Sequence, residues 1–203
     1  MKNAVKFFGI AALAVVIGFT MTVCGGGGGG GAKKSGLSTN GFFGALPAIY
    51  ADNNLADDAI REKHKAAKEK AEKKQNAKAY QKAGDQFDKD LEELSDKLKT
   101  NVDAECAKLA GKEVPFTASD NFREFKVESL KVDATGNIAM TTSDVRKNMM
   151  GVTSFKFKAV AKDGTVIIDH MGYGSEKLNI SGEMRNRPEK WLDFEKIEFS
   201  NAQ

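Results

Sequence analysis

The strongest constraint on the fold is a stretch of 58 residues, from Asn54 to Gly111, that contains no proline. Alanine, lysine, glutamate, aspartate and leucine dominate it, and most of these are good helix formers. Asn53 or Asn54 can cap the start, and Gly111 followed by Pro115 supplies the stop. The sequence therefore predicts a charged helical region over residues 54–111.

The second half of this region carries one continuous apolar face, because apolar residues recur there every three or four positions. These residues are Tyr80, Ala83, Phe87, Leu91, Leu94, Leu98, Val102, Cys106 and Leu109. Such a face has to pack against something, and we expect the part from Phe87 to Leu109 to cover a sheet of the following domain. Cys106 is then a buried, unreactive thiol.

Charge divides the helical region into two unlike halves. Residues 61–75 carry a net charge of +4, and residues 85–105 carry −5. A helical hairpin that breaks near Gln75-Asn76 or Gly84 would set the basic arm against the acidic arm. The alternative is a single helix of about 85 Å that serves as a stalk. Exposed ion pairs contribute only about 0 to 1 kcal/mol each, so they favour one of these two arrangements more than they stabilise either. The hairpin is preferred.

The lysines of the first half could also bind anionic lipid or polyanions. Glu62, Glu69 and Glu72 are interleaved with them, which favours an ordinary solvated helix face. We expect His64, which lies within the same run, to be solvated as well.

After Pro115 the pattern changes to β-branched and aromatic residues with frequent turn signals. The predicted fold class is α+β, a charged N-terminal helix or helical hairpin followed by a small antiparallel β-sandwich of six to seven strands. Lys162-Asp163-Gly164 is the strongest hairpin turn. The predicted strands cover residues 122–132 with a bulge, 138–142, 153–161, 165–169, 177–180 and 191–199.

The N-terminus is built like an export signal. Lys2 and Lys6 form a positive end, and the 17 residues from Phe7 to Val23 carry no charge. Two glycines and two threonines make this stretch marginal for a permanent membrane span. Cleavage is therefore expected.

The tetrapeptide Met21-Thr22-Val23-Cys24 resembles the lipobox of bacterial lipoproteins. Met21 and Val23 depart from the usual leucine and small residue, and the leader is similar to those of spirochaete lipoproteins, which are looser at these positions. The resemblance implies diacylglycerol on Cys24 and an exported protein anchored to a bacterial membrane, on the outer membrane facing the periplasm or the cell surface. Cleavage by ordinary signal peptidase after Ala32 and an uncleaved anchor are the alternatives.

The predicted domain organisation follows from these segments. A run of seven glycines makes the segment after Cys24 a flexible tether, because it cannot offset its conformational entropy by burial. An apolar segment broken by Pro47 comes next, and it docks on the folded domain or on the membrane surface, with docking on the domain preferred. The divisions are residues 1–23 signal peptide, 24–40 tether, 41–53 short apolar segment, 54–111 charged helical region and 112–203 β-rich domain.

Little in the sequence supports catalysis. His64 and His170 are the two histidines, and Asp169 beside His170 points to the opposite face of a strand. A triad of His170 with Ser143 or Ser175 is the one catalytic arrangement left open. No cluster has zinc-ligand spacing, so no metal and no cofactor are predicted. The net charge of +3 falls to +1 without the leader, and nucleic acid is not an expected partner.

Candidate interface residues lie in two loops. Arg185, Arg187 and Trp191 belong to one, and Met149 and Met150 to the other. These residue types are enriched at binding hot spots. For Trp191 the preferred alternative is a core residue whose indole N–H bonds to the backbone.

These features predict a membrane-anchored exported lipoprotein with a non-enzymatic binding or structural role at the cell envelope. Its partners would be the membrane, through the N-terminal lipid, and a protein or envelope ligand. A hydrolase acting on envelope substrate through His170 and Asp169, or an inhibitor of another enzyme, is the alternative.

Overall fold

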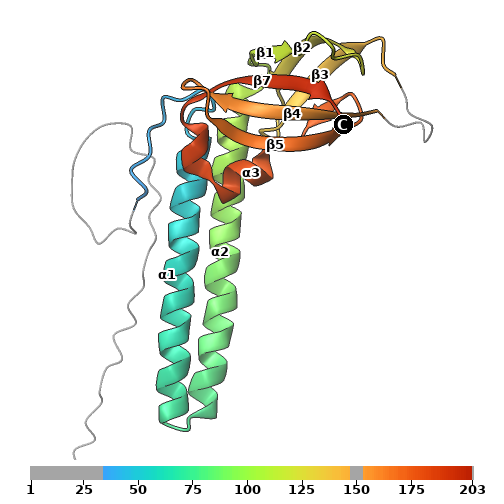
Figure 1. Ribbon diagram of the computed structural model, residues 1–203. Helices are drawn as coiled ribbons and strands as arrows, with labels where there is room; N and C mark the ends of the chain where they lie inside the picture. Colours follow the sequence, from blue (N-terminus) through green and yellow to red (C-terminus); the bar gives the residue numbers. More distant parts are fainter. Residues whose placement is uncertain (1–33, 147–152, 203) are drawn as a thin grey trace, which may run out of the picture. The chain divides into compact units, whose positions relative to one another are not determined.

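The computed structural model describes residues 34–146 and 153–202. Within them the protein is α+β, with two long helices followed by seven strands in two sheets (Figure 1). The elements are α1 (Leu46–Lys73), α2 (Ala77–Leu109), β1 (Phe116–Ala118), β2 (Lys126–Val132), β3 (Ile138–Ser143), β4 (Ser154–Ala161), β5 (Val166–Tyr173), β6 (Lys177–Leu178), α3 (Ser181–Asn186), the 3₁₀ turn η1 (Pro188–Trp191) and β7 (Phe194–Asn201).

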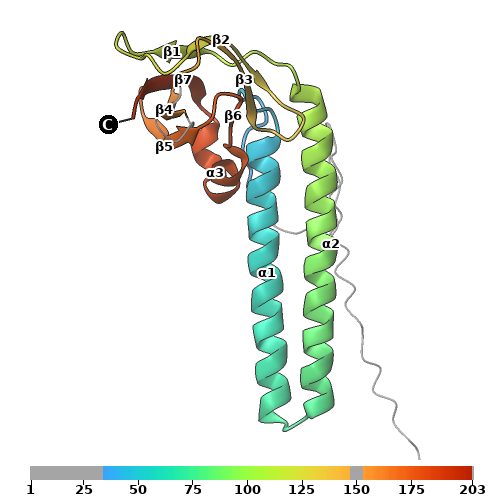
Figure 2. The ribbon, with the colours of Figure 1, turned by 90° about the vertical axis from the view of Figure 1, so that its right-hand side faces the viewer.

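Helices α1 and α2 form a hairpin (Figure 2). The chain reverses just after Lys74, where Gln75 has a φ of +49°. The Asn76 side chain caps α2 by accepting a hydrogen bond of 3.0 Å from the Ala79 N–H. The hairpin prediction with a break at Gln75-Asn76 is confirmed. The stalk and the break at Gly84 are wrong, since Gly84 lies inside α2.

Helices α1 and α2 make polar as well as apolar contacts with each other. Lys63 of α1 pairs with Asp90 of α2 at 2.9 Å. His64 stacks on Phe87 with ring centroids 4.2 Å apart, and its Nδ1 lies 3.1 Å from the Ala83 carbonyl. The expectation of a solvated His64 is therefore wrong, because the hairpin turn brings α2 against it.

Helix α1 begins at Leu46, earlier than the predicted start at Asn54. Pro47 lies in its first turn, where a missing N–H is tolerated, so Pro47 does not break this segment. The predicted caps Asn53 and Asn54 lie inside the helix. Phe43, just before α1, is fully buried. Docking of the apolar segment on the folded domain is thus confirmed.

The strands form one sheet of order β1-β7-β4-β5 and another of order β2-β3-β6. All pairs are antiparallel except β1 with β7, which is parallel. The prediction of an entirely antiparallel arrangement is wrong there, since β1 and β7 lie at opposite ends of the β-rich region and a parallel pair needs a long connection. The predicted bulge in β2 is confirmed between Val127 and Ser129, as is the β4–β5 hairpin.

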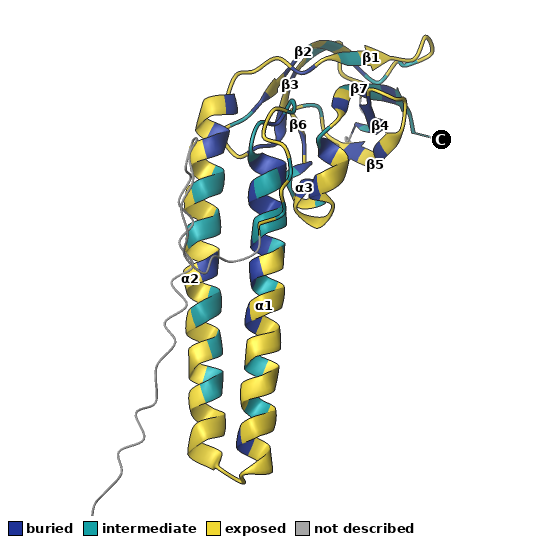
Figure 3. Cartoon of the chain, turned by 90° about the vertical axis from the view of Figure 1, so that its left-hand side faces the viewer, coloured by how far each residue is buried: buried dark blue, intermediate teal, exposed yellow. Residues whose placement is uncertain are grey.

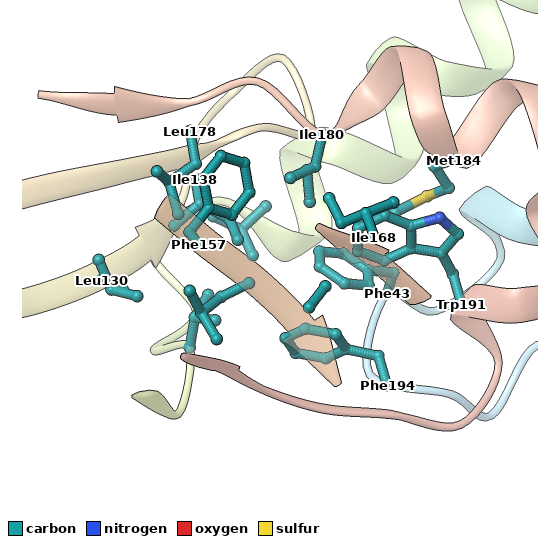
Figure 4. Close-up of a cluster of buried hydrophobic side chains, with 14 of the residues drawn as sticks. Phe43, Leu130, Ile138, Phe157, Ile168, Leu178, Ile180, Met184, Trp191 and Phe194 are labelled. Carbon is teal, nitrogen blue, oxygen red and sulfur yellow. The ribbon is translucent and has the colours of Figure 1, made fainter. Parts of the chain in front are cut away.

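One apolar cluster, the core cluster, takes side chains from both sheets, from α3 and η1, and from the sheet-proximal ends of α1 and α2 (Figures 3 and 4). Of α2, Cys106 and Leu109 belong to it, with Leu98 and Val102 packed against it. The prediction that the face from Phe87 onward covers a sheet is wrong for its first half, which faces α1. Cys106 is fully buried and burial raises its pKa, as expected for a structural thiol.

The chain divides between Met1–Lys33 and Lys34–Gln203. Every described element and the whole core cluster belong to the second part. Residues 34–203 therefore contain what is needed to fold as one unit.

The turn between β2 and β3 ties α3 to the sheets. Asp133 Oδ1 accepts hydrogen bonds from Thr135 N and Oγ1, both at 2.7 Å, and from Asn137 N at 3.0 Å. Its Oδ2 lies 2.8 Å from Lys177 Nζ. The buried Asn137 side chain in turn accepts from the N–H groups of Ile180 and Ser181, where α3 begins.

Burial alone would raise the pKa of Asp133, but the hydrogen bonds from Lys177, Thr135 and Asn137 outweigh it and hold the pKa at about 2. A lowered pKa gives stability that is complete above the unfolded value of about 3.9 and is lost as the pH falls through about 2. We expect Asp133→Asn to lower the free energy of unfolding by about 1 to 2 kcal/mol at pH 7, and the difference from wild type to shrink between pH 4 and 2.

Urea unfolding at several pH values measures this difference. Asp169→Asn is the control, because the Asp169 carboxylate is half exposed and 3.7 Å from Lys158, an ion pair of the kind that contributes little. Equal effects of the two substitutions at pH 7 would contradict the assignment.

Candidate interaction surface

Strand β5 is an edge strand. It pairs with β4 on one side, and no described strand pairs with its other side. Its eight residues therefore present an unpaired row of backbone N–H and C=O groups. Edges of this length are sites where another extended segment can add.

Exposed apolar side chains lie along this edge. Val166 is 43% exposed, Met171 39% and Tyr173 67%. Met171 lies opposite Lys156 and Tyr173 opposite Ser154, which places both on the sheet face that points away from the core cluster. We call Val166–Tyr173 with these three side chains the β5 edge. It contains no lysine and no proline, the residues that commonly block such edges.

The structure separates the two residues of the predicted catalytic pair. Asp169 faces Lys158 at 3.7 Å, while His170 Nε2 lies 3.4 Å from Glu183 Oε1 of α3. This follows from the alternation of side chains along a strand. His170 lies on the core side of β5, opposite Phe157.

The two candidate serines of a triad make other contacts. The Ser143 hydroxyl donates to Glu128 at 2.7 Å, in the sheet that does not contain β5. Ser175 accepts a hydrogen bond of 3.1 Å from Thr142 Oγ1 through its backbone carbonyl. Neither contact brings a serine hydroxyl to His170.

Of the predicted interface residues, Trp191 is corrected. Its side chain is fully buried, stacked on Phe194 at 5.9 Å and edge-on to Phe43 at 5.5 Å (Figure 4). The alternative of a core residue is confirmed. The indole N–H makes no hydrogen bond to any described residue, so the expected bond to the backbone is wrong.

Arg185 and Arg187 are exposed, at the end of α3. The Arg185 carbonyl accepts a hydrogen bond of 2.9 Å from Asn54 Nδ2, which ties α3 to α1. Through the contact between Glu183 and His170, the same short helix lies beside β5 (Figures 1 and 2). Met149, Met150 and Cys24 lie outside the described residues.

Sequence reasoning missed the β5 edge. The hairpin turn at Lys162-Asp163-Gly164 predicted a strand from Thr165 to Asp169, but the strand runs from Val166 to Tyr173. Position in the sheet is set by the pairing of β4 with β7, residues far apart in the sequence. The available signal was the absence of lysine and proline from Val166 to Tyr173.

Within residues 34–146 and 153–202 no group of histidine, cysteine and carboxylate side chains could hold a metal ion. In the same ranges, every helix is too short or too polar to cross a membrane. Comparison of the chain with protein-family models, with curated proteins and with solved structures gave no match in any of the three.

Proposed function

We propose that this chain is an exported lipoprotein, held to a bacterial membrane by lipid on Cys24, whose β-rich domain binds an extended segment of a partner protein along the β5 edge. The role is one of binding, not catalysis. The leader and the Met21-Thr22-Val23-Cys24 tetrapeptide support the anchor. The two sheets share one core cluster, which supports their pairing as a β-sandwich.

The open edge of β5 carries the binding proposal. An added strand would gain hydrogen bonds to the unpaired backbone groups of β5, and its alternate side chains would meet Met171 and Tyr173. Native sheets usually protect long edges with charges, bulges or covering loops. Asp169 is the one acidic residue within β5, and Lys158 pairs with it. A register shift opposite Ala159 and Val160 and the contact of His170 with Glu183 lie on this strand as well. The exposed apolar side chains of Met171 and Tyr173 nevertheless suit it to a transient or permanent strand partner.

A pair of lysines on the edge tests this surface. Met171→Lys with Tyr173→Lys would put two charges where the partner strand lies, and we expect capture of an envelope protein to fall at least tenfold. The measurement is crosslinking through a photoreactive residue at Val166, in the wild type and in the double variant. Leu55→Lys is the control, because Leu55 is 39% exposed, like Met171, but lies on α1. Equal crosslinking in the double variant would contradict the β5 edge as the binding site.

The anchor is tested separately by labelling with a fatty acid and by detergent phase partitioning. We expect label in the wild type and none in Cys24→Ser. Label that persists in Cys24→Ser would show that another position is modified.

A hydrolase is the second candidate, favoured by the contact of His170 with Glu183, since a carboxylate can orient a histidine base. A screen of envelope substrates with the wild type and with His170→Ala distinguishes it. Turnover that is lost in His170→Ala would replace binding as the function.

A further inference from the structure

The hairpin turn gathers lysines from both helices at one end. Residues 65–82, the basic tip, contain seven lysines and two glutamates, a net charge of +5. Five of the lysines come from α1 and the residue just after it, and two from α2. They are Lys65, Lys68, Lys70, Lys73, Lys74, Lys78 and Lys82.

The rest of the hairpin has the opposite sign. Outside the basic tip, residues 46–109 carry a net charge of −6. The expected arrangement of a basic arm against an acidic arm is therefore only partly made, with Lys63 and Asp90 at the boundary. The reason is the position of the turn, which sets residues 77–90 against the basic arm and most of the acidic residues against α1 residues 46–60, which are acidic themselves.

The lysines of the basic tip are available to a partner. None of the seven takes part in an ion pair within the described part of the chain, and all but Lys68 are exposed. Lys68 lies over the ring of Tyr80 at 4.8 Å, and Tyr80 is itself 40% exposed. Figure 3 shows the turn end of the hairpin almost wholly exposed, in contrast to the end near the sheets.

We propose that the basic tip binds the anionic headgroups of a phospholipid membrane surface. Near such a surface each lysine contributes about a fivefold factor to the partition coefficient, so several lysines at one end suffice for measurable binding. The acidic remainder of the hairpin is repelled by the same surface, so the tip meets the membrane first. Tyr80 adds an aromatic ring of the kind that favours the headgroup region.

The proposed lipid on Cys24 is not needed for this contact, because every lysine of the basic tip lies within residues 65–82.

Vesicle binding is tested with residues 34–203. This segment lacks the predicted leader and carries 28 basic and 28 acidic residues, a formal net charge of zero. Binding to anionic vesicles then has to come from a local patch. We expect at least tenfold more protein to sediment with vesicles of phosphatidylcholine and phosphatidylglycerol (about 3:1) than with phosphatidylcholine alone. Salt of about 0.5 M should abolish the difference, since the screening length is then about 4 Å.

Two variants of equal charge locate the patch. Lys65→Gln, Lys70→Gln, Lys73→Gln and Lys74→Gln together remove four charges from the basic tip. The matched control removes four exposed lysines elsewhere, with Lys89→Gln, Lys99→Gln, Lys162→Gln and Lys190→Gln. We expect the tip variant to lose binding at least tenfold and the control to lose much less, with equal helix content of both by circular dichroism.

Equal losses in the two variants, or equal sedimentation with neutral vesicles, would overturn the proposal. So would a wild type that ignores vesicles but dimerises at low salt, because the basic tip would then meet the acidic part of a second copy. Because residues 34–203 do not include Cys24, an absence of vesicle binding would not contradict the proposed lipid on Cys24. Likewise, an absence of fatty-acid label would not contradict membrane binding by the basic tip.

Discussion

Phe43→Ala is expected to lower the free energy of unfolding by about 3 to 5 kcal/mol, the usual loss for a buried phenylalanine. The Phe43 side chain is fully buried, with ring centroids 5.0 Å from Phe194 and 5.5 Å from Trp191 (Figure 4). It joins the segment before α1 to η1 and β7. Removing the ring would leave a cavity between elements that are distant in the sequence, where the surroundings cannot easily close.

Trp191 is the one tryptophan of the chain, so its fluorescence reports unfolding at this place. Phe42→Ala is the control, because the Phe42 side chain is only half-buried, with Lys112 Nζ 4.1 Å from the centroid of its ring. We expect this substitution to lower the free energy of unfolding by about 1 to 2 kcal/mol. Equal losses for the two phenylalanines in urea would show that the segment before α1 is not seated in the core cluster.

Glu105→Ala is expected to cost about 2 to 3 kcal/mol at pH 7. Glu105 of α2 is buried, and its carboxylate accepts a hydrogen bond of 2.9 Å from the N–H of Ala45, the N-cap residue of α1. No side chain of α1 itself caps that end. Gly44, with a φ of +55°, leaves the space that the carboxylate fills, since a side chain there would collide with it. Glu105 thus closes the open end of the hairpin.

The contribution of Glu105 depends on pH in a known direction. Burial raises its pKa, but the hydrogen bond from Ala45 and the Lys108 ammonium at 2.8 Å outweigh burial, and the net pKa is lowered. Its stabilisation is therefore complete above the unfolded pKa of about 4.3 and is lost as the pH falls through the lower folded value.

Glu105→Gln, which keeps a hydrogen-bond acceptor, should cost about 1 kcal/mol at pH 7 and progressively less below pH 4. Urea unfolding from pH 7 to pH 3 measures this. Asp103→Asn is the matched control, an exposed carboxylate two residues away on α2. A constant difference between wild type and Glu105→Gln over that range would contradict the assignment.

The elements that the sequence predicted correctly are those that depend on residues close together in the chain. The proline-free stretch gave both long helices, and the alternation of Phe155 and Phe157 with lysines gave β4 and its inward face. The sequence offered two positions for the turn, Gln75-Asn76 and Gly84, and the structure shows the first, where the Asn76 side chain caps α2. The failures were the start of α1, the helix α3 and the parallel pairing of β1, each of which depends on residues far away in the chain.

The same difference between local and long-range contacts explains which candidate site residues were predicted correctly. Arg185 and Arg187 are exposed as a polar loop suggested, but Trp191 is buried because Phe43, some 150 residues earlier, packs on it. The β5 edge was missed because exposure of an edge depends on which strand takes the last place in a sheet. Composition and spacing carry no information about that choice.

The sequence by itself determined the helical middle and the β-rich end, because charge and hydrophobic period act over a few residues. The export leader and lipid on Cys24 are predictions of the sequence that the labelling experiment tests. The tertiary structure decided between the two predicted turns, and this choice gives the hairpin a basic tip and an acidic remainder. A turn at Gln75-Asn76 folds the chain so that Lys78 and Lys82 join the lysines of α1, and it sets acid against acid nearer the sheets. That placement depends on where the chain reverses as well as on how its charges are ordered, and only the first of these needed the tertiary structure.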